Sequence, residues 1–193
     1  IGNWLEVVEC IECIKGKNVS DLMEVTYVLG GAMLQLGGKA TTLEEGISKC
    51  KEVIANGKAY DKFLQLVKKQ NGDISFIENT EKYPKSKLEI TIEAMSDGFI
   101  SAIDSLEVGL TAIMLGAGRM KMDDVLDMKA GIMLKKKVGD SVKKGETLAT
   151  MFTDTVSESA KQRLQNSFTI SSSQPKKEKL MKAVVNEKGV REF

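Results

Sequence analysis

The sequence contains no histidine among its 193 residues, and this absence excludes several kinds of active site. Without histidine, the chain cannot assemble a Ser-His or Cys-His nucleophile, nor a zinc site of the ordinary histidine-containing type. Only three cysteines are present, which is too few for a closed disulfide framework. In a reducing compartment none of them needs to pair.

Long apolar runs and an excess of one charge are also missing. No run approaches the roughly 20 residues that span a bilayer, and the segment from Ile1 to Lys15 carries acid where a leader peptide carries basic residues. The 28 Lys and Arg nearly cancel the 27 Asp and Glu, so no global field attracts nucleic acid or an anionic membrane. With 42% hydrophobic residues the chain can bury a core. We therefore expect a soluble, cytoplasmic, folded protein with no nucleic-acid or membrane partner.

Apolar residues at helical spacing predict four helices before Asn71-Gly72. The first covers residues 4–14 and ends before Gly16. The second begins at Ser20 or Asp21, either of which can cap it, and ends at Gly37-Gly38. Its predicted inward face consists of Leu22, Val25, Leu29, Ala32, Met33 and Leu36.

The third predicted helix opens with a capping box formed by Thr41 and Glu44 and ends before Gly57. A shorter fourth helix precedes Asn71. The side chains that these two helices are expected to bury are Leu43, Ile47, Cys50, Ile54, Tyr60, Phe63, Leu64 and Val67.

The pattern changes at the polar segment around Pro84, where we place a domain boundary. Residues 88–94 alternate apolar and polar, the period of a half-buried strand. After a tight turn at Asp97-Gly98, the sequence predicts a returning strand over 99–103, a helix over 106–114 and a helix stop at 116–118. The elements predicted for the rest of the chain are strands at 132–134 and 148–152, a helix near 156–164, a strand at 168–170 and a Lys-rich helix from Pro175 to Val185. The second half is therefore α+β.

The first helix carries one pattern of cysteines and one of glutamates. Each pattern has both a functional and a structural interpretation. Cys10 and Cys13 share one side of the helix, but they lie in its middle among carboxylates, whereas a redox pair usually sits at a helix start. Small buried cysteines are the favoured interpretation. Glu6, Glu9 and Glu12 form an acidic strip that could offer oxygen ligands to a hard cation, although spacing alone favours a solvated face.

Two glycine-containing motifs lie in the second half. The segment Gly116-Ala117-Gly118-Arg119 follows a helix and lacks the ending of a phosphate loop, so a helix stop explains it better. The segment from Gly139-Asp140 to Gly145-Glu146 has the turn chemistry of biotinyl or lipoyl carrier domains. Met120-Lys121-Met122 imitates a biotinylated hairpin, but Lys121 precedes the Gly-Asp turn, whereas in carriers the modified lysine follows it. We therefore favour the carrier fold without its function.

A set of motifs is spread over residues 1 to 152. They are Gly2-Asn3-Trp4-Leu5-Glu6-Val7-Val8-Glu9-Cys10-Ile11, Leu29-Gly30, Leu36-Gly37-Gly38-Lys39-Ala40, residues 98–104, Gly109, Leu115-Gly116-Ala117-Gly118-Arg119, residues 127–132 and Lys136-Lys137-Val138-Gly139-Asp140. In this order and at this spacing, the motifs resemble the family of pyrimidine-nucleoside and thymidine phosphorylases. Trp4 and Met128-Lys129 depart from the family's pattern.

The resemblance implies a pentosyltransferase of nucleoside salvage, in which phosphate converts a pyrimidine nucleoside to base and pentose 1-phosphate. Residues 1–84 would be the helical C-terminal part of its catalytic α/β domain. Residues 85–193 would form an α/β-hammerhead, or barrel-sandwich-like, C-terminal domain with a tail. The family's catalytic residues precede the part matching Gly2-Asn3, so we expect no catalytic residue and no organic cofactor site here, and no activity of this chain alone.

The family also binds a monovalent, potassium-like cation, and the position matching its side-chain ligand is Glu9. The other ligands of that site precede the matched region, and the parent enzyme would be a homodimer. The alternative function is a non-catalytic biotinyl- or lipoyl-like carrier or interaction module, which a covalent adduct on Lys121 would reveal.

Overall fold

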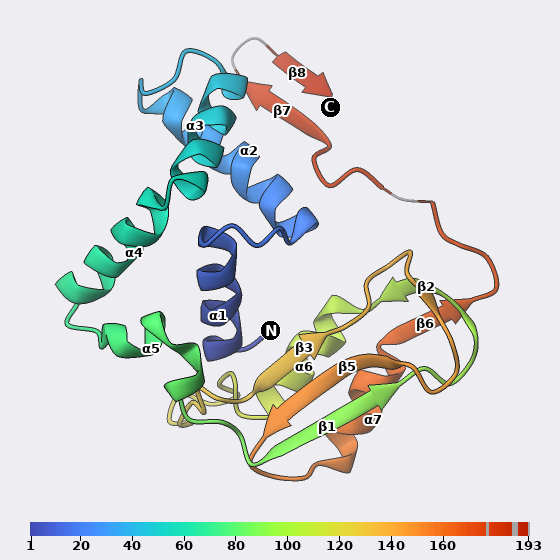
Figure 1. The fold of residues 1–193 in the computed structure, drawn as a ribbon. Coiled ribbons are helices and arrows are strands. Elements are labelled where there is room, and N and C mark those ends of the chain that lie inside the picture. Colours follow the sequence, from blue (N-terminus) through green and yellow to red (C-terminus); the bar gives the residue numbers. More distant parts are fainter. Residues whose placement is uncertain (177, 187–188, 193) are drawn as a thin grey trace. The chain divides into compact units, whose positions relative to one another are not determined.

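The computed structural model describes residues 1–176, 178–186 and 189–192, and it divides into two compact units (Figure 1). The β-rich unit consists of residues 1–8 and 81–177, and the helical unit of residues 9–80 and 178–193. The helices are α1 (Asn3–Ile14), α2 (Ser20–Leu36), α3 (Leu43–Ala55), α4 (Lys58–Lys69), α5 (Ile74–Glu78), the 3-10 helix η1 (Thr80–Lys82), α6 (Ser105–Met114) and α7 (Glu158–Asn166). The strands are β1 (Leu88–Glu93), β2 (Gly98–Ile103), β3 (Gly131–Leu134), β4 (Ser141–Val142), β5 (Thr147–Thr153), β6 (Phe168–Ser171), β7 (Ala183–Asn186) and β8 (Gly189–Glu192).

The predicted α+β class and the extents of α1 to α4 are confirmed, but two predicted helix caps are wrong. Helix α2 begins after Val19, and no side chain caps it. At α3 the N-cap is Thr42, one residue later than predicted, and its hydroxyl accepts from the Glu45 amide. The Glu45 carboxylate in turn accepts from the amide and hydroxyl of Thr41. Short elements such as α5 and β4 have too few residues for a periodic pattern and were not predicted.

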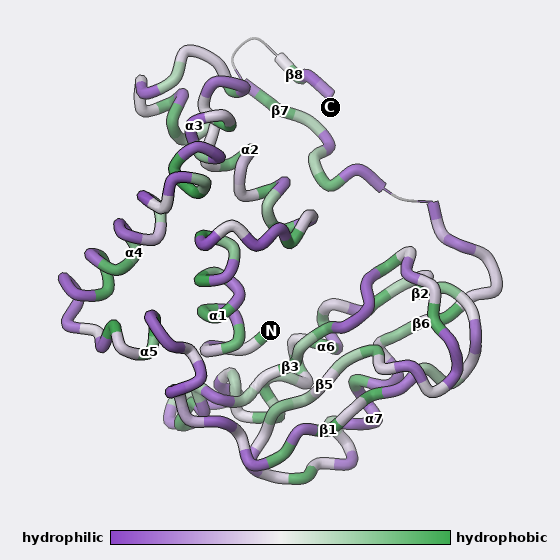
Figure 2. The backbone as a smooth tube through the Cα atoms, viewed as in Figure 1, coloured by the Kyte–Doolittle hydropathy of each residue, from purple (hydrophilic) through white to green (hydrophobic). Residues whose placement is uncertain are grey.

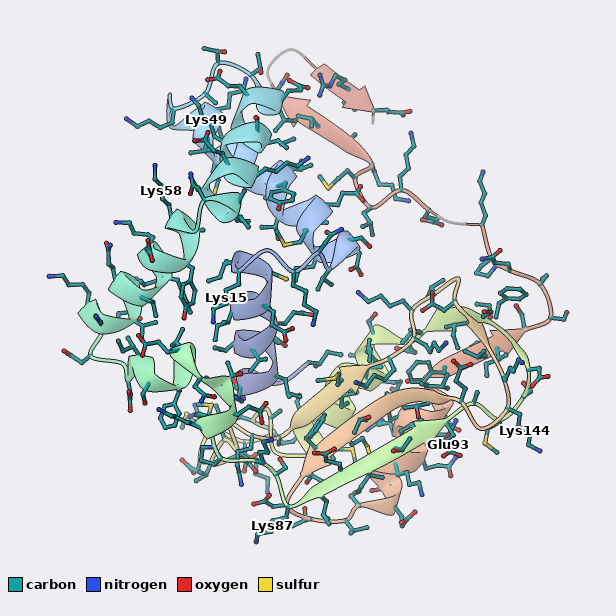
Figure 3. The ribbon with its side chains drawn as sticks, in the orientation of Figure 1. Lys15, Lys49, Lys58, Lys87, Glu93 and Lys144 are labelled. Atoms are coloured by element: carbon teal, nitrogen blue, oxygen red, sulfur yellow. The ribbon has the colours of Figure 1, made fainter. Side chains whose placement is uncertain are left out.

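Helices α2 and α3 cross at two glycines. A Cβ on Gly46 would lie 2.4 Å from the carbonyl oxygen of Gly31, so no larger residue fits without movement of the backbone. In the same unit, the Lys15 ammonium lies 4.5 Å from the centre of the Tyr60 ring on α4, and Lys15 is labelled in Figure 3. Hydrophilic and hydrophobic residues alternate along α3 and α4, as expected of helices with one packed face (Figure 2).

The face of α2 that packs is not the predicted one. Met23 and Gly31 are buried, whereas four of the predicted inward side chains are exposed. The exposed fractions are 36% for Leu22, 55% for Leu29, 67% for Met33 and 89% for Leu36. The prediction fails because Gly31 follows Leu22 by about two and a half helical turns and so lies on the opposite side of α2. Helix α3 crosses α2 closely on the side that carries Gly31.

The β-rich unit contains two three-stranded antiparallel sheets, in the orders β1-β5-β3 and β4-β2-β6 (Figure 1). Apart from β4, their strand segments are those predicted, but the tight hairpin predicted at Asp97-Gly98 is wrong. Strand β1 pairs with β5, from Leu88 opposite Thr153 onward, and β2 pairs with β4 and β6. The positive φ of 152° at Gly98 marks the point where the chain passes from one sheet to the other.

One hydrophobic core joins both sheets to α6 and α7. Helix α6 begins at Asp104, whose carboxylate accepts from the amides of Leu106 and Glu107, and α7 begins at Ser157, whose hydroxyl accepts from the Ala160 amide. The buried members of this core are Ile92, Ala94, Ile100, Val108, Ala112, Leu115, Ala130, Ile132, Val142, Leu148, Ala149, Met151, Ala160, Leu164 and Phe168.

The tail differs from the prediction of a Lys-rich helix from Pro175 to Val185. Of the described residues in this range, 183–185 belong to strand β7, which pairs with β8, and the others form no helix. The β-branched pair Val184-Val185 favours a strand; Lys177 lies outside the described residues. The predicted assignment of residues 1–84 and 85–193 to two domains stays a prediction; by packing, residues 1–8 group with the β-rich unit and 178–193 with the helical unit.

Candidate functional site

Two motifs that carry the sequence resemblance meet in the β-rich unit, although they lie 114 residues apart. The Asn3 side-chain amide donates to the carbonyl oxygen of Ala117 at 2.9 Å. The Trp4 backbone amide donates to the carbonyl oxygen of Met128 at 3.1 Å. The start of α1 is therefore attached to the loop that follows α6, and sequence reasoning had identified both motifs without predicting this contact.

The residues before α1 pair with the edge strand β3. The Ile1 amino group donates to the Ile132 carbonyl at 2.8 Å, and the Ile132 amide donates to the Ile1 carbonyl at 2.7 Å. Two glycines make this approach possible. A Cβ on Gly2 would lie 2.5 Å from the Ala130 carbonyl oxygen, and one on Gly131 would lie 2.3 Å from the Ile1 carbonyl oxygen. Glycine in the Gly2-Asn3 motif is thus required by packing.

A cluster of ion pairs attaches the connecting segment around Pro84 to the same unit. The Lys129 ammonium lies 2.7 Å from an Asp154 carboxylate oxygen and 3.6 Å from one of Asp127. The other Asp154 oxygen accepts from the Lys87 amide at 2.9 Å. The hydrogen bond with Lys129, and then the Lys87 amide, hold the pKa of Asp154 below its usual range. Sequence reasoning missed this cluster, since nothing local links Lys129 to a carboxylate 25 residues away.

Glu9, the predicted metal ligand, lies on α1 with its side chain exposed. The other two glutamates of the acidic strip have partners within the chain. A Glu6 carboxylate oxygen accepts a hydrogen bond from the Gly2 amide at 3.1 Å, and Glu12 forms an ion pair with Lys17. Glu9 itself makes no hydrogen bond or ion pair with any described residue. Within the described ranges, no three Asp, Glu, Cys or His side chains gather closely enough to hold a metal ion. The role of Glu9 as a metal ligand stays a prediction.

Cys10, Cys13 and Cys50 form no disulfide, and the predicted burial is confirmed for Cys13 but wrong for Cys10. Cys10 is exposed and Cys13 is buried, so the two sulfurs do not share one environment. Burial, followed by the charge of Glu9, raises the pKa of the Cys13 thiol, and burial alone raises that of Cys50. A raised pKa keeps the thiol protonated and makes it a poor nucleophile or metal ligand.

The glycine motifs have the local roles that the sequence predicts. Gly116, with a φ of 102°, ends α6, and the Ala117 amide donates to the Ala112 carbonyl as in a helix stop. In the following turns, the carboxylate of Asp140 accepts from the Lys137 amide at 2.8 Å, and that of Glu146 accepts from the Lys143 amide at 3.0 Å. The second turn carries Lys144, labelled in Figure 3, whose amide donates to the Asp97 carboxylate.

Lys121 lies in the loop between α6 and β3, with its side chain exposed. The Asp124 carboxylate accepts from the backbone amides of Met120 and Lys121, so the loop is held by its own hydrogen bonds. No strand of the described residues lies between α6 and β3, so Lys121 is not at the tip of a β-hairpin like the modified lysine of a carrier.

The polar interactions described above hold the elements of the β-rich unit together. Carboxylates of the β-rich unit cap α6, close turns or pair with lysines. The hollow lined by Met95, Ser96, Leu148, Gln165, Asn166, Phe168 and Ile170 contains no charged side chain. None of the described helices is long and apolar enough to cross a membrane.

Comparison with known proteins agrees with the resemblance. Residues 99–171 match the family model described as the pyrimidine nucleoside phosphorylase C-terminal domain. The chain is 45% identical over 152 residues to a pyrimidine-nucleoside phosphorylase of Bacillus subtilis, an alignment that covers 79% of this chain and 35% of that protein. It is 40% identical over 173 residues to the enzyme of the same name from Staphylococcus epidermidis, covering 89% of this chain and 40% of that protein. A relative from Staphylococcus haemolyticus is 42% identical over 151 residues.

These relatives are pyrimidine-nucleoside phosphorylases, which are pentosyltransferases, and this chain corresponds to their carboxy-terminal part. It spans only 35% to 40% of their length. The predicted family resemblance is confirmed. The alternative of a carrier or interaction module is not favoured, because the matches are to phosphorylases.

Proposed function

We propose that this chain, whose residues 99–171 belong to the family of pyrimidine nucleoside phosphorylase C-terminal domains, acts as the carboxy-terminal part of such an enzyme. The enzyme would convert a pyrimidine nucleoside, such as thymidine or uridine, and phosphate to the base and a pentose 1-phosphate. The observation that carries this proposal is the 45% identity to the Bacillus subtilis relative over 152 residues.

In this reaction the described residues would act as a scaffold. Phosphate attacks the anomeric carbon while charge develops on the departing base, so catalysis depends on positioning and electrostatic stabilisation. The hydrogen bonds of Asn3 with Ala117 and of Trp4 with Met128 agree with this scaffold role, since they hold the first turn of α1 on the β-rich unit. The groups that contact the substrates would come from the part of the enzyme that precedes the matched region.

We propose a hammerhead, barrel-sandwich-like architecture for the β-rich unit. Support comes from the two three-stranded antiparallel sheets around one core with α6 and α7. The turns at Asp140 and Glu146 give further support, because they are the turns that resemble those of carrier domains. Each is closed by a hydrogen bond from a backbone amide to its carboxylate.

We also propose that Glu9 is the one side-chain ligand that this chain supplies to a monovalent, potassium-like cation. Its exposed carboxylate has no partner among the described residues, and a hard cation favours oxygen ligands. A single carboxylate holds such an ion weakly, so the remaining ligands would come from the preceding part of the enzyme. The complete enzyme would be a cytoplasmic homodimer without an organic cofactor.

The proposal is tested with a chimera in which this chain takes the place of the aligned region of the Bacillus subtilis relative and of whatever follows it. We expect the chimera to release base from thymidine or uridine in the presence of phosphate, and this chain alone to give no release above a buffer blank. A folded but inactive chimera would contradict the proposal. Turnover by the isolated chain would contradict the scaffold role, and a biotinyl or lipoyl adduct on Lys121 in an intact-mass spectrum would favour a carrier.

A further inference from the structure

Helix α2 carries an exposed apolar stripe along its length. We define the α2 stripe as Leu22, Leu29, Met33 and Leu36, whose exposed fractions range from 36% to 89%. Three of these are leucines spaced by seven residues, the repeat of a helix that packs lengthwise against another element. The opposite side of α2 is already occupied, because Gly31 packs against Gly46 of α3. The stripe is therefore a second packing face of the same helix.

The helical unit is also poor in buried apolar side chains. Its described residues include five, whereas the core of the β-rich unit has 15. The five are Ile11, Cys13, Met23, Ala40 and Ile77. Helix α4 has no buried residue, although its sequence is strongly amphipathic. Amphipathic helices gain most of their stability by burying an apolar face. The few buried side chains of this unit therefore indicate that its helices need a further surface to pack against.

We propose that the α2 stripe is an interface that packs against the part of the phosphorylase chain preceding the region matched here. This inference rests on the proposed function and names the partner of the helical unit. The matched relatives are long enough to supply such a surface, since the region aligned with this chain is only 35% of the Bacillus subtilis protein.

A second copy of this chain is a less suitable occupant. The stripe has four side chains, whereas each partner in a stable interface between separate proteins contributes roughly 20–30 residues. Separate molecules must also lose translational and rotational freedom when they associate. A surface on the same polypeptide avoids most of that cost, because the covalent connection keeps its effective concentration high. A small apolar stripe is therefore sufficient within one chain and insufficient between two.

The test introduces one carboxylate into the stripe, as Leu29→Glu and separately as Met33→Glu. Leucine, methionine and glutamate have similar helix propensities, so the isolated chain should keep its thermal midpoint. In the chimera with the Bacillus subtilis relative, the same carboxylates would be buried without a partner, and we expect each to lower the midpoint by at least about 3 °C. Ser48→Glu is the matched control, since it adds the same charge at an exposed position of α3 and should change neither protein.

The outcomes separate this inference from the proposed function. If the unmodified chimera is folded and active but Leu29→Glu and Met33→Glu leave its midpoint unchanged, the inference is overturned and the proposed function stands. If the chimera is folded and inactive, the proposed function fails whatever the stripe variants do. If the isolated chain is a dimer in sedimentation and the stripe variants make it monomeric, a second copy occupies the stripe and the inference is overturned.

Discussion

Single glycines decide how closely the elements of this protein can approach. Gly46 lies against the backbone of Gly31, where a Cβ would be 2.4 Å from a carbonyl oxygen. Apart from its chain neighbours and the backbone of its own helix, Gly109 on α6 has no atom within 4 Å of the position that a Cβ would take, and its φ is not positive. The same residue type therefore has a packing role at one position and none at the other.

We expect Gly46→Ala and Gly109→Ala to change stability in opposite directions. At Gly46 the backbone of α2 must move, which costs about 1–3 kcal/mol, the usual cost of overpacking. At Gly109 the added methyl group meets no obstacle and alanine favours the helix, for a gain of up to about 1 kcal/mol. In urea unfolding, circular dichroism measures Gly46→Ala in the helical unit, and Trp4 emission measures Gly109→Ala in the β-rich unit. A Gly46→Ala protein as stable as the parent would contradict the close crossing.

The carboxylate of Glu45 is a residue-scale feature whose contribution to stability depends on pH. The ammonium of Lys49, and then the hydroxyl and amide of Thr41, lower its pKa to about 2. Because this pKa lies below the value of about 4.3 for an unfolded glutamate, ionised Glu45 favours the folded state. Its contribution is fully present above about pH 4.3 and is lost as the pH falls through about 2.

Glu45→Gln should therefore lower the thermal midpoint at neutral pH, and the difference from the unmodified chain should shrink as the pH falls from about 4.3 toward 2. Glu52→Gln, which removes the same charge near the other end of α3, is the control for the loss of charge alone. A constant difference for Glu45→Gln across the acid range would mean that the carboxylate is not held by Lys49 and Thr41.

Between elements, the first turn of α1 and the connecting segment near Pro84 are joined by an aromatic pair. The rings of Trp4 and Tyr83 are stacked, with centroids 4.0 Å apart and planes at 17°. Nearby, Ser86 donates to the Lys129 carbonyl, and Lys87 donates to Asp154. A segment that reads as a polar linker in sequence is thus attached by side chains along its length.

The single tryptophan makes this pair easy to monitor. We expect Tyr83→Ala to expose the Trp4 ring, to shift its fluorescence emission to longer wavelength, and to remove about 0.5–1.5 kcal/mol of stacking in addition to the lost burial. Tyr83→Phe keeps the ring and should leave the emission unchanged. An unshifted emission maximum in Tyr83→Ala would show that the two rings do not stack in solution.

At the scale of the whole molecule, the two units differ in how much apolar surface they bury. Each fully buried aliphatic side chain contributes about 1.5–3 kcal/mol relative to an exposed one. The β-rich unit has 15 buried apolar side chains in one cluster, and the described residues of the helical unit have five. Compact units with such different cores need not unfold together.

We therefore expect two unfolding transitions in urea. Helical circular dichroism reports mainly the helical unit, which contains α2 to α5, and should change at the lower concentration. Trp4 lies in the β-rich unit, and its emission should change at the higher one. Coincident transitions for the two signals would mean that the units unfold as one cooperative body.

Much of the local structure was predictable because it depends on neighbours in sequence. The apolar period and the flanking glycines located α1 to α4 within one or two residues. Alternation located β1, and the Gly139-Asp140 pattern located a turn closed by the Asp140 carboxylate. The predicted helix after Pro175 was wrong, since the lysines there form no apolar stripe and Val184-Val185 pair as a strand.

The candidate site was predictable only in part. Glu9 and the motifs at Gly2-Asn3 and Gly116-Ala117 were identified from their residues, but the contact between Asn3 and Ala117 was not. Neither was the pairing of Lys129 with Asp154. Such partners lie far apart in the chain, and no period or spacing relates one to the other.

The sequence by itself determined where most helices and strands lie, which turns carboxylates close, and which family the chain resembles. Each of these depends on hydrogen bonds between near neighbours or on the identity of short motifs. Only the tertiary structure decided that β1 pairs with β5, that α2 packs through Gly31, and that its leucine side is left exposed. An amphipathic pattern shows that a helix has an apolar face, but the choice between two possible packing faces depends on the shape of the element that meets it.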